Sequence, residues 1–355
     1  MATESATGVQ VAKYDQRMRT DAADDTNYYW LSPVDPPFQL TGLPWFARDG
    51  RYRRLPVQPR FPLPEAVDAL ANCPAGAQLR FQTNSTRLGL TVRLAGPSNM
   101  YHMPATGQSG FDCYLRYPAG WRYVRTAAFA PDATTYQVAM YANLPREMRA
   151  VTLNFPLYQG VEDVQVGLEG DAELLPPPPF VDSRPIIIYG TSITQGGCAC
   201  RPGMAHTNII SRRLNREVIN LGFSGSGKGE PEVAEAIAEI PDPACYVLEY
   251  EANVLSADAL QQTLPAFIDI LRRDHPRVPI LVVSRVAFAN DQYDPTYLQA
   301  RIARRDIQRT TVERLRQTGD AHLHFLDGAP LLGEDFDECT VDGVHPTDLG
   351  FLRIA

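Results

Sequence analysis

Two segments far apart in the chain carry residue types that suit nucleophilic catalysis. Ser192 closes the short sequence GTS at 190–192, and Asp342 stands three residues before His345 in the segment 340–346 (TVDGVHP). A serine hydroxyl attacks an acyl carbon once an imidazole takes its proton, and a nearby carboxylate can fix the orientation of that imidazole. Taken separately, the serine is also typical of a helix N-cap, and the Asp–His pair is typical of a polar surface loop. Their meaning therefore depends on whether the fold brings them together.

A glycine-rich segment and an asparagine follow two other apolar runs. Residues 222–227 (GFSGSG) come after the run 217–221, and within them Gly225 lets the backbone approach a ligand closely. Asn253 comes shortly after the run 245–248 and brings an amide side chain. Taken separately, Gly225 could be a simple turn residue and Asn253 could be a helix cap. The placement of Ser, Gly, Asn and Asp-x-x-His after successive apolar runs favours one shared site.

The elements that must position these residues alternate between two kinds in the second half of the chain. Apolar runs of strand length are separated by helical stretches, which predicts an α/β domain with a mostly parallel five-stranded sheet between helices. Sites in such sheets lie at the carboxyl ends of the strands, where the residues above stand. The predicted strands are 185–189, 217–221, 245–248, 279–283 and 322–326, and the predicted helices are 207–214, 231–240, 257–273 and 296–317.

The first half of the chain has a different pattern. Short runs such as 78–83 (QLRFQT) and 88–94 (LGLTVRL) alternate with Gly, Pro and Asn, which is typical of a β-sandwich. Four consecutive prolines begin the segment 176–185 (PPPPFVDSRP) and predict a stiff linker. We therefore expect a disordered tail at 1–27, a jelly-roll-like sandwich at 28–175, a linker at 176–185 and an α/β domain at 186–355.

The second half resembles the GDSL/SGNH hydrolase superfamily, which is named for a Ser, a Gly, an Asn and a His in four blocks. The resemblance covers about residues 186–355, and Asp-Gly-Val-His-Pro is its most specific part. It implies a flavodoxin-like catalytic domain in which Ser192 is the nucleophile, His345 is the base and Asp342 orients His345.

The resemblance also implies an oxyanion hole. Its donors would be the N–H groups of Ser192 and Gly225 and the side chain of Asn253. Two departures from the family pattern stand out: Gly-Thr-Ser replaces the usual Gly-Asp-Ser, and the block around Asn253 lacks its usual Gly-x-Asn-Asp form. The second departure lies in the block that carries Asn253.

The first half carries a resemblance of its own. Residues 110–114 (GFDCY) are similar to the Gly-x-Asp-Leu-Tyr signature of a β-sandwich domain found ahead of some GDSL domains. We expect loops of this domain to pack against the catalytic edge, with His102 and Met103 bordering the substrate pocket. His206 is a third candidate for this pocket, although a polar residue at the start of a helix is the simpler interpretation.

Charge and composition exclude several other classes. The net charge of −8 argues against a nucleic-acid partner, and no apolar run reaches the roughly 20 residues of a membrane helix. The N-terminus lacks the apolar stretch of a secretory signal, which favours a cytoplasmic protein. Cys198 and Cys200 have no second Cys/His pair at zinc spacing, so no metal site is expected. The segment 222–228 matches G-x-x-x-x-G-K, but Gly229 replaces the Ser or Thr of a phosphate-binding loop.

The resemblance thus implies acyl transfer through an acyl-Ser192 intermediate. The chain is similar to GDSL-type acyltransferases of tetracycline-class polyketide tailoring in actinomycetes. A cytoplasmic location and an arginine-rich composition typical of actinomycetes favour an O-acyltransferase that passes an acyl group from acyl-CoA, with no other cofactor, to a hydroxyl of a small-molecule natural product. An esterase that hydrolyses an acylated sugar or natural product is the alternative. A nucleotide-binding protein and a non-catalytic binding module are remote alternatives, and the oligomeric state is left open.

Overall fold

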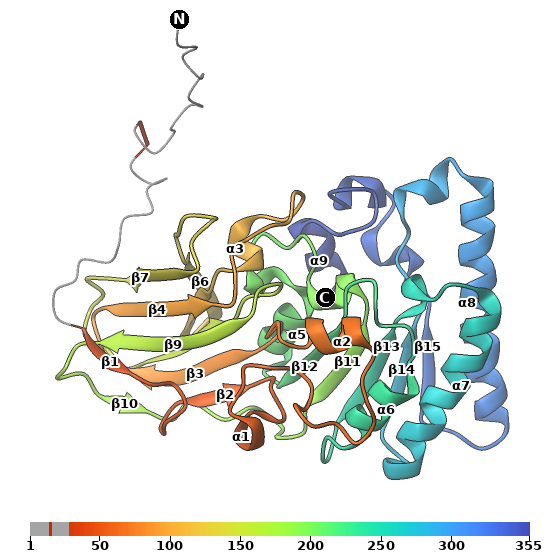
Figure 1. Cartoon of the computed structure of the whole chain (residues 1–355), viewed down its shortest axis with the longest axis horizontal. Coiled ribbons are helices and arrows are strands. Elements are labelled where there is room, and N and C mark those ends of the chain that lie inside the picture. The colour runs from red at the N-terminus through yellow and green to blue at the C-terminus, as the bar shows by residue number, and fades with distance from the viewer. Residues whose placement is uncertain (1–13, 16–27) are drawn as a thin grey trace, which may run out of the picture.

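The chain forms two domains that lie side by side (Figure 1). The computed structural model describes residues 14–15 and 28–355, so the tail expected at 1–27 lies almost entirely outside the described residues. The first domain consists mainly of antiparallel strands, and the second is an α/β domain. Within the described part of the chain, no helix is both long enough and apolar enough to cross a membrane.

The first domain is a sandwich of two antiparallel sheets, as expected. One sheet has the order β1-β9-β4-β7, and the other has the order β10-β3-β8-β5-β6 with β2 paired to β3. Alternation decides which side chains enter the core: in β4, Leu90 and Val92 are buried whereas Arg93 is exposed. The strands are β1 Tyr29–Leu31, β2 Gln39–Thr41, β3 Gln78–Thr83, β4 Leu88–Leu94, β5 Asp112–Tyr117, β6 Gly120–Thr126, β7 Thr135–Tyr141, β8 Arg149–Asn154, β9 Val161–Leu168 and β10 Leu174–Leu175.

The second domain contains a five-stranded sheet with the order β12-β11-β13-β14-β15. All of its neighbouring strands are parallel, so the expected mostly parallel sheet is wholly parallel. Because β12 and β13 flank β11, the chain reverses direction across the sheet at β11, which is where α/β folds place ligands. The strands are β11 Ile186–Gly190, β12 Val218–Gly222, β13 Cys245–Glu249, β14 Ile280–Val283 and β15 Leu323–Leu326.

Helices cover both faces of this sheet (Figure 1). One face packs against α6 Pro231–Ala238, α7 Ala257–Asp274 and α8 Pro295–Gln317, and the other packs against α5 His206–Leu214 and α9 Asp348–Ile354. Consecutive strand residues point to opposite faces, so Ile187 and Tyr189 enter the first layer whereas Ile188 faces the second. Shorter helices are α1 Phe46–Asp49, α2 Glu65–Leu70, α3 Ala105–Gln108 and α4 Ser192–Gln195, and single 3-10 turns connect other elements.

The segment 45–71 of the first domain completes the core of the second. Trp45, Leu55, Val67 and Ala71 are buried in the same apolar cluster as strands β11 to β15 and helices α6 to α8. Figure 1 shows α2 against the strands of the second domain rather than against the sandwich. The two domains therefore share a hydrophobic core.

Candidate active site

Ser192 lies at the start of the one-turn helix α4, directly after β11. The Thr191 hydroxyl accepts a hydrogen bond from Ile193 N at 3.2 Å and caps this helix, and Gly196 ends it with a φ of 107°. The turn packs closely on the next strand, since a Cβ added to Gly222 would lie 2.1 Å from Gln195 N. The sequence therefore holds Ser192 at the carboxyl end of β11, which lies between β12 and β13 in the sheet.

Asp342 and His345 lie in a tight turn that brings them to Ser192. Val341 N donates to His345 O at 2.8 Å, and Gly343 takes a φ of 85°, a conformation that favours glycine. His345 Nε2 lies 2.8 Å from Ser192 Oγ, and His345 Nδ1 lies 2.7 Å from Asp342 Oδ2. The three side chains thus form a continuous chain of hydrogen bonds.

The environment of Asp342 determines how protons are arranged in this chain. Burial raises the pKa of Asp342, but hydrogen bonds from the His345 backbone and ring and from Val344 N outweigh it and hold the pKa below its ordinary value. Asp342 is therefore an ionised acceptor, so His345 Nδ1 carries the ring proton. His345 Nε2 is then free to accept the proton of the Ser192 hydroxyl.

Three potential donors surround the position that an oxyanion would occupy. Among residues 28–355, the N–H groups of Ser192 and Gly225 have no hydrogen-bond partner, whereas Ser224 N donates to Gln195 Oε1 and Ser226 N donates to Phe223 O. Gly225 has a φ of 65°, and a Cβ there would meet nothing within 4 Å. The Asn253 amide donates to Phe223 O at 3.2 Å, which fixes its position beside the same loop.

These groups border one cavity of about 330 Å³. This volume is near the lower end of those typical for small-molecule sites. Its lining combines polar groups with the apolar side chains of Phe288, Tyr297 and Val344, which the sequence analysis did not identify. The cavity is lined by Thr191, Ser192, Ile193, Ser224, Gly225, Ala252, Asn253, Phe288, Tyr297, Val344 and His345.

Two side chains of the first domain support the loops of the site, and the sequence analysis missed both. Tyr158 OH donates to the backbone oxygen of Ser192 at 3.2 Å. Arg54 is fully buried, donates to Gly222 O and to Asn220 O (3.3 Å), and stacks over the Phe223 ring at 4.6 Å. No carboxylate within the described part of the chain binds Arg54, and backbone carbonyls accept its hydrogen bonds instead. In the sequence Arg54 is one of three arginines at 51–54 (RYRR), and nothing there distinguishes it from its neighbours.

The three pocket candidates from the sequence lie in different places. His102 Nε2 is 3.8 Å from Asp342 Oδ2, and its ring contacts the His345 ring edge-to-face at 5.5 Å. Met103 is buried in an apolar cluster between the domains. His206 lines a separate internal cavity of about 150 Å³, and burial lowers its pKa to about 4. None of the three candidates is among the residues that line the Ser192 cavity, but the structure brings His102 to the Asp342–His345 pair beside it.

A buried carboxyl group lies beneath the serine turn. Glu249 accepts hydrogen bonds from Thr194 Oγ1 at 2.9 Å and Thr191 Oγ1 at 3.3 Å, and its accessible surface faces the internal cavity. Burial raises the pKa of Glu249 to about 8, against the opposing effect of these hydrogen bonds. A neutral Glu249 places no negative charge under the turn that carries Ser192.

A parallel sheet with a serine at the end of its first strand along the chain and an Asp–His pair after its last strand defines a serine hydrolase of α/β architecture. Residues 183–355 match the GDSL-like lipase/acylhydrolase family, and residues 28–174 match the N-terminal domain of SGNH-hydrolase-type esterases. The second domain therefore belongs to the GDSL/SGNH hydrolase superfamily, and the chain has the two-domain organisation of SGNH-type esterases. The chain is an enzyme of the esterase or acyltransferase kind.

Solved structures share this organisation over nearly the whole chain. A putative GDSL-like lipase from Bacteroides ovatus is 28% identical with a TM-score of 0.85, covering 92% of this chain and 95% of its own. The salicylyl-acyltransferase SsfX3 from a tetracycline biosynthetic pathway is 21% identical (TM-score 0.74, 92% and 94% covered). A family two carbohydrate esterase from Cellvibrio japonicus is 14% identical (TM-score 0.57, 92% and 95% covered). No curated protein sequence matches significantly.

Proposed function

We propose that the chain is a serine-dependent acyl-transfer enzyme that acts through an acyl-Ser192 intermediate. The observation that carries this proposal is the pair of short distances from His345, 2.8 Å to Ser192 Oγ and 2.7 Å to Asp342 Oδ2, at the wall of a ligand-sized cavity. His345 takes the serine proton as Ser192 Oγ attacks the acyl carbon, and it then returns the proton to the leaving group.

The tetrahedral intermediate would be stabilised by three donors. The N–H groups of Ser192 and Gly225 need no reorganisation because neither has another partner in the described part of the chain. The second hydrogen of the Asn253 amide supplies the third donor, since the first is held by Phe223 O. A second nucleophile, water or an alcohol, then attacks the acyl-enzyme with His345 as base.

Of the two acceptors, we favour a hydroxyl of a small-molecule natural product, with acyl-CoA as donor. The apolar side chains of Phe288, Tyr297 and Val344 border the Ser192 cavity, and such a lining limits water and suits an organic acceptor. The fold similarity to a salicylyl-acyltransferase over 92% of the chain is consistent with this choice. A cytoplasmic location would give access to acyl-CoA and is part of the proposal.

The alternative is an esterase that hydrolyses an acylated sugar or natural product. The fold similarity to family two carbohydrate esterases supports this alternative, since these enzymes share the two-domain arrangement. The chemistry up to acyl-Ser192 is the same in both cases.

Two measurements test the proposal. A reactive phosphonate should add one label to the protein at Ser192, and Ser192→Ala should lower kcat on an activated ester by about 10⁴-fold or more while leaving thermal unfolding unchanged. A Ser192→Ala enzyme that retains a tenth of the activity would overturn the assignment. Turnover of short acyl-CoA esters with and without polyhydroxylated or phenolic acceptors then separates the two activities: ester product identifies a transferase, and free acid alone identifies an esterase.

A further inference from the structure

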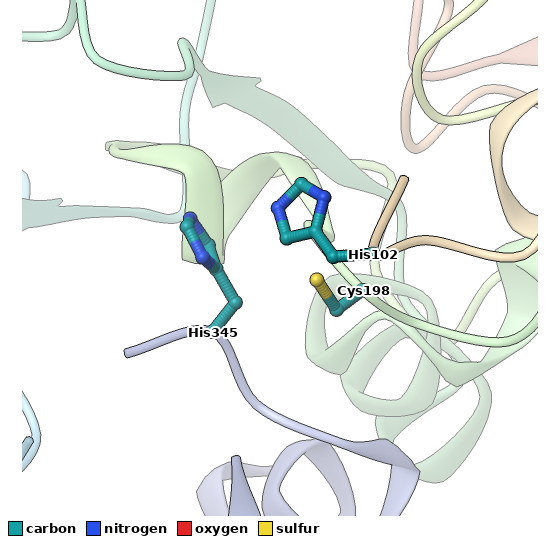
Figure 2. A group of neighbouring side chains, drawn as sticks. All are labelled: His102, Cys198 and His345. Carbon is teal, nitrogen blue, oxygen red and sulfur yellow. The ribbon is translucent and has the colours of Figure 1, made fainter. Parts of the chain in front are cut away.

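The fold places a third potential ligand group beside the two histidines of the site. One side-chain atom each of His102, Cys198 and His345 lies within 4.8 Å of the other two (Figure 2). The three residues come from a loop of the first domain, from the segment after α4 and from the turn after β15. Cys198 was the residue for which the sequence showed no partners at zinc spacing, because its neighbours here are about a hundred residues or more away in the chain.

The conformation of Cys198 directs its thiol into this cluster. Cys198 has a φ of 74°, a left-handed conformation that costs a non-glycine residue on the order of 1 kcal/mol. Only 4% of its surface is exposed, and in Figure 2 its sulfur points toward the space between the two imidazole rings.

His102 offers a nitrogen that the protein does not use. Its Nδ1 is buried and has no hydrogen-bond partner among residues 28–355, and its Nε2 is 3.8 Å from the ionised Asp342 carboxylate. The ring is held between Tyr101, which stacks on it at 4.5 Å, and His345. Within the described part of the chain, the ring therefore has no hydrogen bond for a metal to displace, and its Nε2, which faces the ionised carboxylate, is in a setting that favours a cation.

We propose that His102, Cys198 and His345 form a binding site for a thiophilic divalent cation, best matched by Zn²⁺, and that its occupation reversibly inhibits the enzyme. Imidazole nitrogen and thiolate sulfur are both zinc ligands, and three protein ligands leave a fourth position for water or substrate. Around a bound zinc ion the three ligand atoms would lie about 3.5 Å apart. Side-chain rotations that move each ligand atom by about 1 Å would bring them to these positions. Mg²⁺ and Ca²⁺ prefer oxygen ligands and are not expected to bind here.

Inhibition follows from the roles proposed for His345. Its two ring nitrogens are each needed, one for Asp342 at 2.7 Å and the other for Ser192 at 2.8 Å, so a metal bound to either nitrogen breaks the relay. On binding, a zinc–sulfur bond forms, and the Cys198 thiol releases its proton to solvent. This part of the inference rests on the proposed function, whereas zinc binding itself does not.

Zinc binding is measured without activity, by titrating the Ser192→Ala protein against a chromophoric zinc chelator. We expect one site in Ser192→Ala, with the affinity lowered about tenfold or more when Cys198→Ser or His102→Ala is added. Cys200→Ser is the matched control, because Cys200 is two residues away and its N–H binds Asp348 instead. Co²⁺ in place of zinc should give a thiolate-to-metal charge-transfer band that Cys198→Ser abolishes. Absence of a site in Ser192→Ala, or equal affinity after Cys198→Ser, would overturn the proposal.

Inhibition is then measured on an activated ester in zinc-buffered solution. We expect zinc to inhibit the unmodified chain and the Cys200→Ser variant, with full recovery after addition of a chelator. Cys198→Ser should keep its activity and require about tenfold more zinc for the same inhibition. Equal inhibition of Cys198→Ser, or zinc binding without loss of activity, would disprove the inhibitory role. A chain that hydrolyses no ester would refute the proposed function, and the chelator titration would still decide the metal site.

Discussion

The position of Asn253 shows how one side chain can serve both structure and chemistry. Its amide nitrogen carries two hydrogens, of which one goes to Phe223 O at 3.2 Å in the loop that also contains Gly225. The other hydrogen is available to the cavity that Ser192 and Gly225 border. The departure of this region from the usual Gly-x-Asn-Asp block therefore leaves the donor in place.

Replacement of Asn253 by alanine should affect the transition state more than binding. We expect Asn253→Ala to lower kcat by about 10² to 10³, a loss of about 3 kcal/mol, with little change in KM. The measurement is steady-state kinetics on an activated ester, with thermal unfolding as the control for folding. A variant with unchanged kcat would exclude Asn253 from the oxyanion hole.

At the scale of elements, Arg54 connects the first domain to the loop that carries Gly225. Its guanidinium donates to the carbonyls of Gly222, Asn220, Cys73 (2.6 Å) and Leu70 (2.9 Å) and lies over Phe223. A planar group with five donors can satisfy four carbonyls at once, which lysine cannot. Arg54 is therefore a positioning residue for the loop after β12.

We expect Arg54→Lys to lower kcat roughly tenfold or more, because a displacement of about 1 Å in a donor is costly to catalysis. Arg53→Lys is the matched control, since Arg53 is also buried but donates to Leu55 O, Asp68 and Asn72 within the first domain. Both variants should lose stability to chemical denaturation. A fall in kcat per active site in both variants, or in neither, would contradict a positioning role specific to Arg54.

The buried carboxyl of Glu249, beneath α4, should make stability depend on pH. Its pKa is about 8 in the folded chain against an ordinary value of 4.5, so between these pH values the folded chain holds a proton that the unfolded chain has released. The free energy of unfolding should therefore fall as the pH rises through this range. Burial also raises the pKa of Glu251, to about 7, which adds to the decline.

Glu249→Gln should reduce this decline, because glutamine stays neutral in the same hydrogen bonds. Urea unfolding at about pH 5 and about pH 8 measures the effect. An identical decline in the variant would show that Glu249 does not titrate in the range expected. The smaller fall in the free energy of unfolding that Glu251 causes should remain in the Glu249→Gln variant.

The regular elements of the second domain could be predicted almost to the residue. The predicted strand 185–189 is observed as Ile186–Gly190, and the predicted helix 257–273 is observed as Ala257–Asp274. Long apolar runs and clear caps make these boundaries readable. Helices α1 and α2 were missed because four to six residues are too few to show a helical period.

Only part of the candidate site could be predicted from the sequence, because some of its residues meet only through the packing of distant segments. Ser192, Asp342 and His345 stand at sequence positions that family resemblance and strand ends both indicate. The contacts of Arg54, Tyr158 and Cys198 with the site depend on how distant segments pack, and apolar spacing carries no information about which partner a face will meet. Only the tertiary structure could reveal them.

For the whole molecule, the shared core should make the domains inseparable. Residues 181–355 alone would lack Trp45, Leu55, Val67 and Ala71, which are buried against the second domain's sheet and helices. Arg54 and Tyr158 would be lost as well. We therefore expect this fragment to aggregate or to be inactive when it is expressed without the first domain.

The measurement compares the turnover of small and bulky esters by the fragment and by the full chain. In the full chain, Leu55→Ala should cost about 2 to 5 kcal/mol and lower the unfolding temperature of both domains together. A soluble fragment with the activity of the whole chain would show that the two domains are independent.

The linker at 176–185 also holds the two domains together. Gln82 donates to Pro176 O at 2.7 Å, and Arg80 donates to Pro178 O at 2.8 Å and lies over the Phe180 ring. The predicted stiff linker is therefore also fastened to β3. Insertion of a flexible spacer would have to break these contacts before the domains could separate.

The order of the shared core along the chain has a consequence for synthesis on the ribosome. Residues 45–71 are translated well before β11, so their apolar side chains are exposed until the second domain emerges. The sandwich can close first, but this segment cannot reach its final place during that interval. A nascent chain paused before β11 should therefore be a preferred client of chaperones that bind exposed apolar segments, and it should be released once the α/β domain has been made.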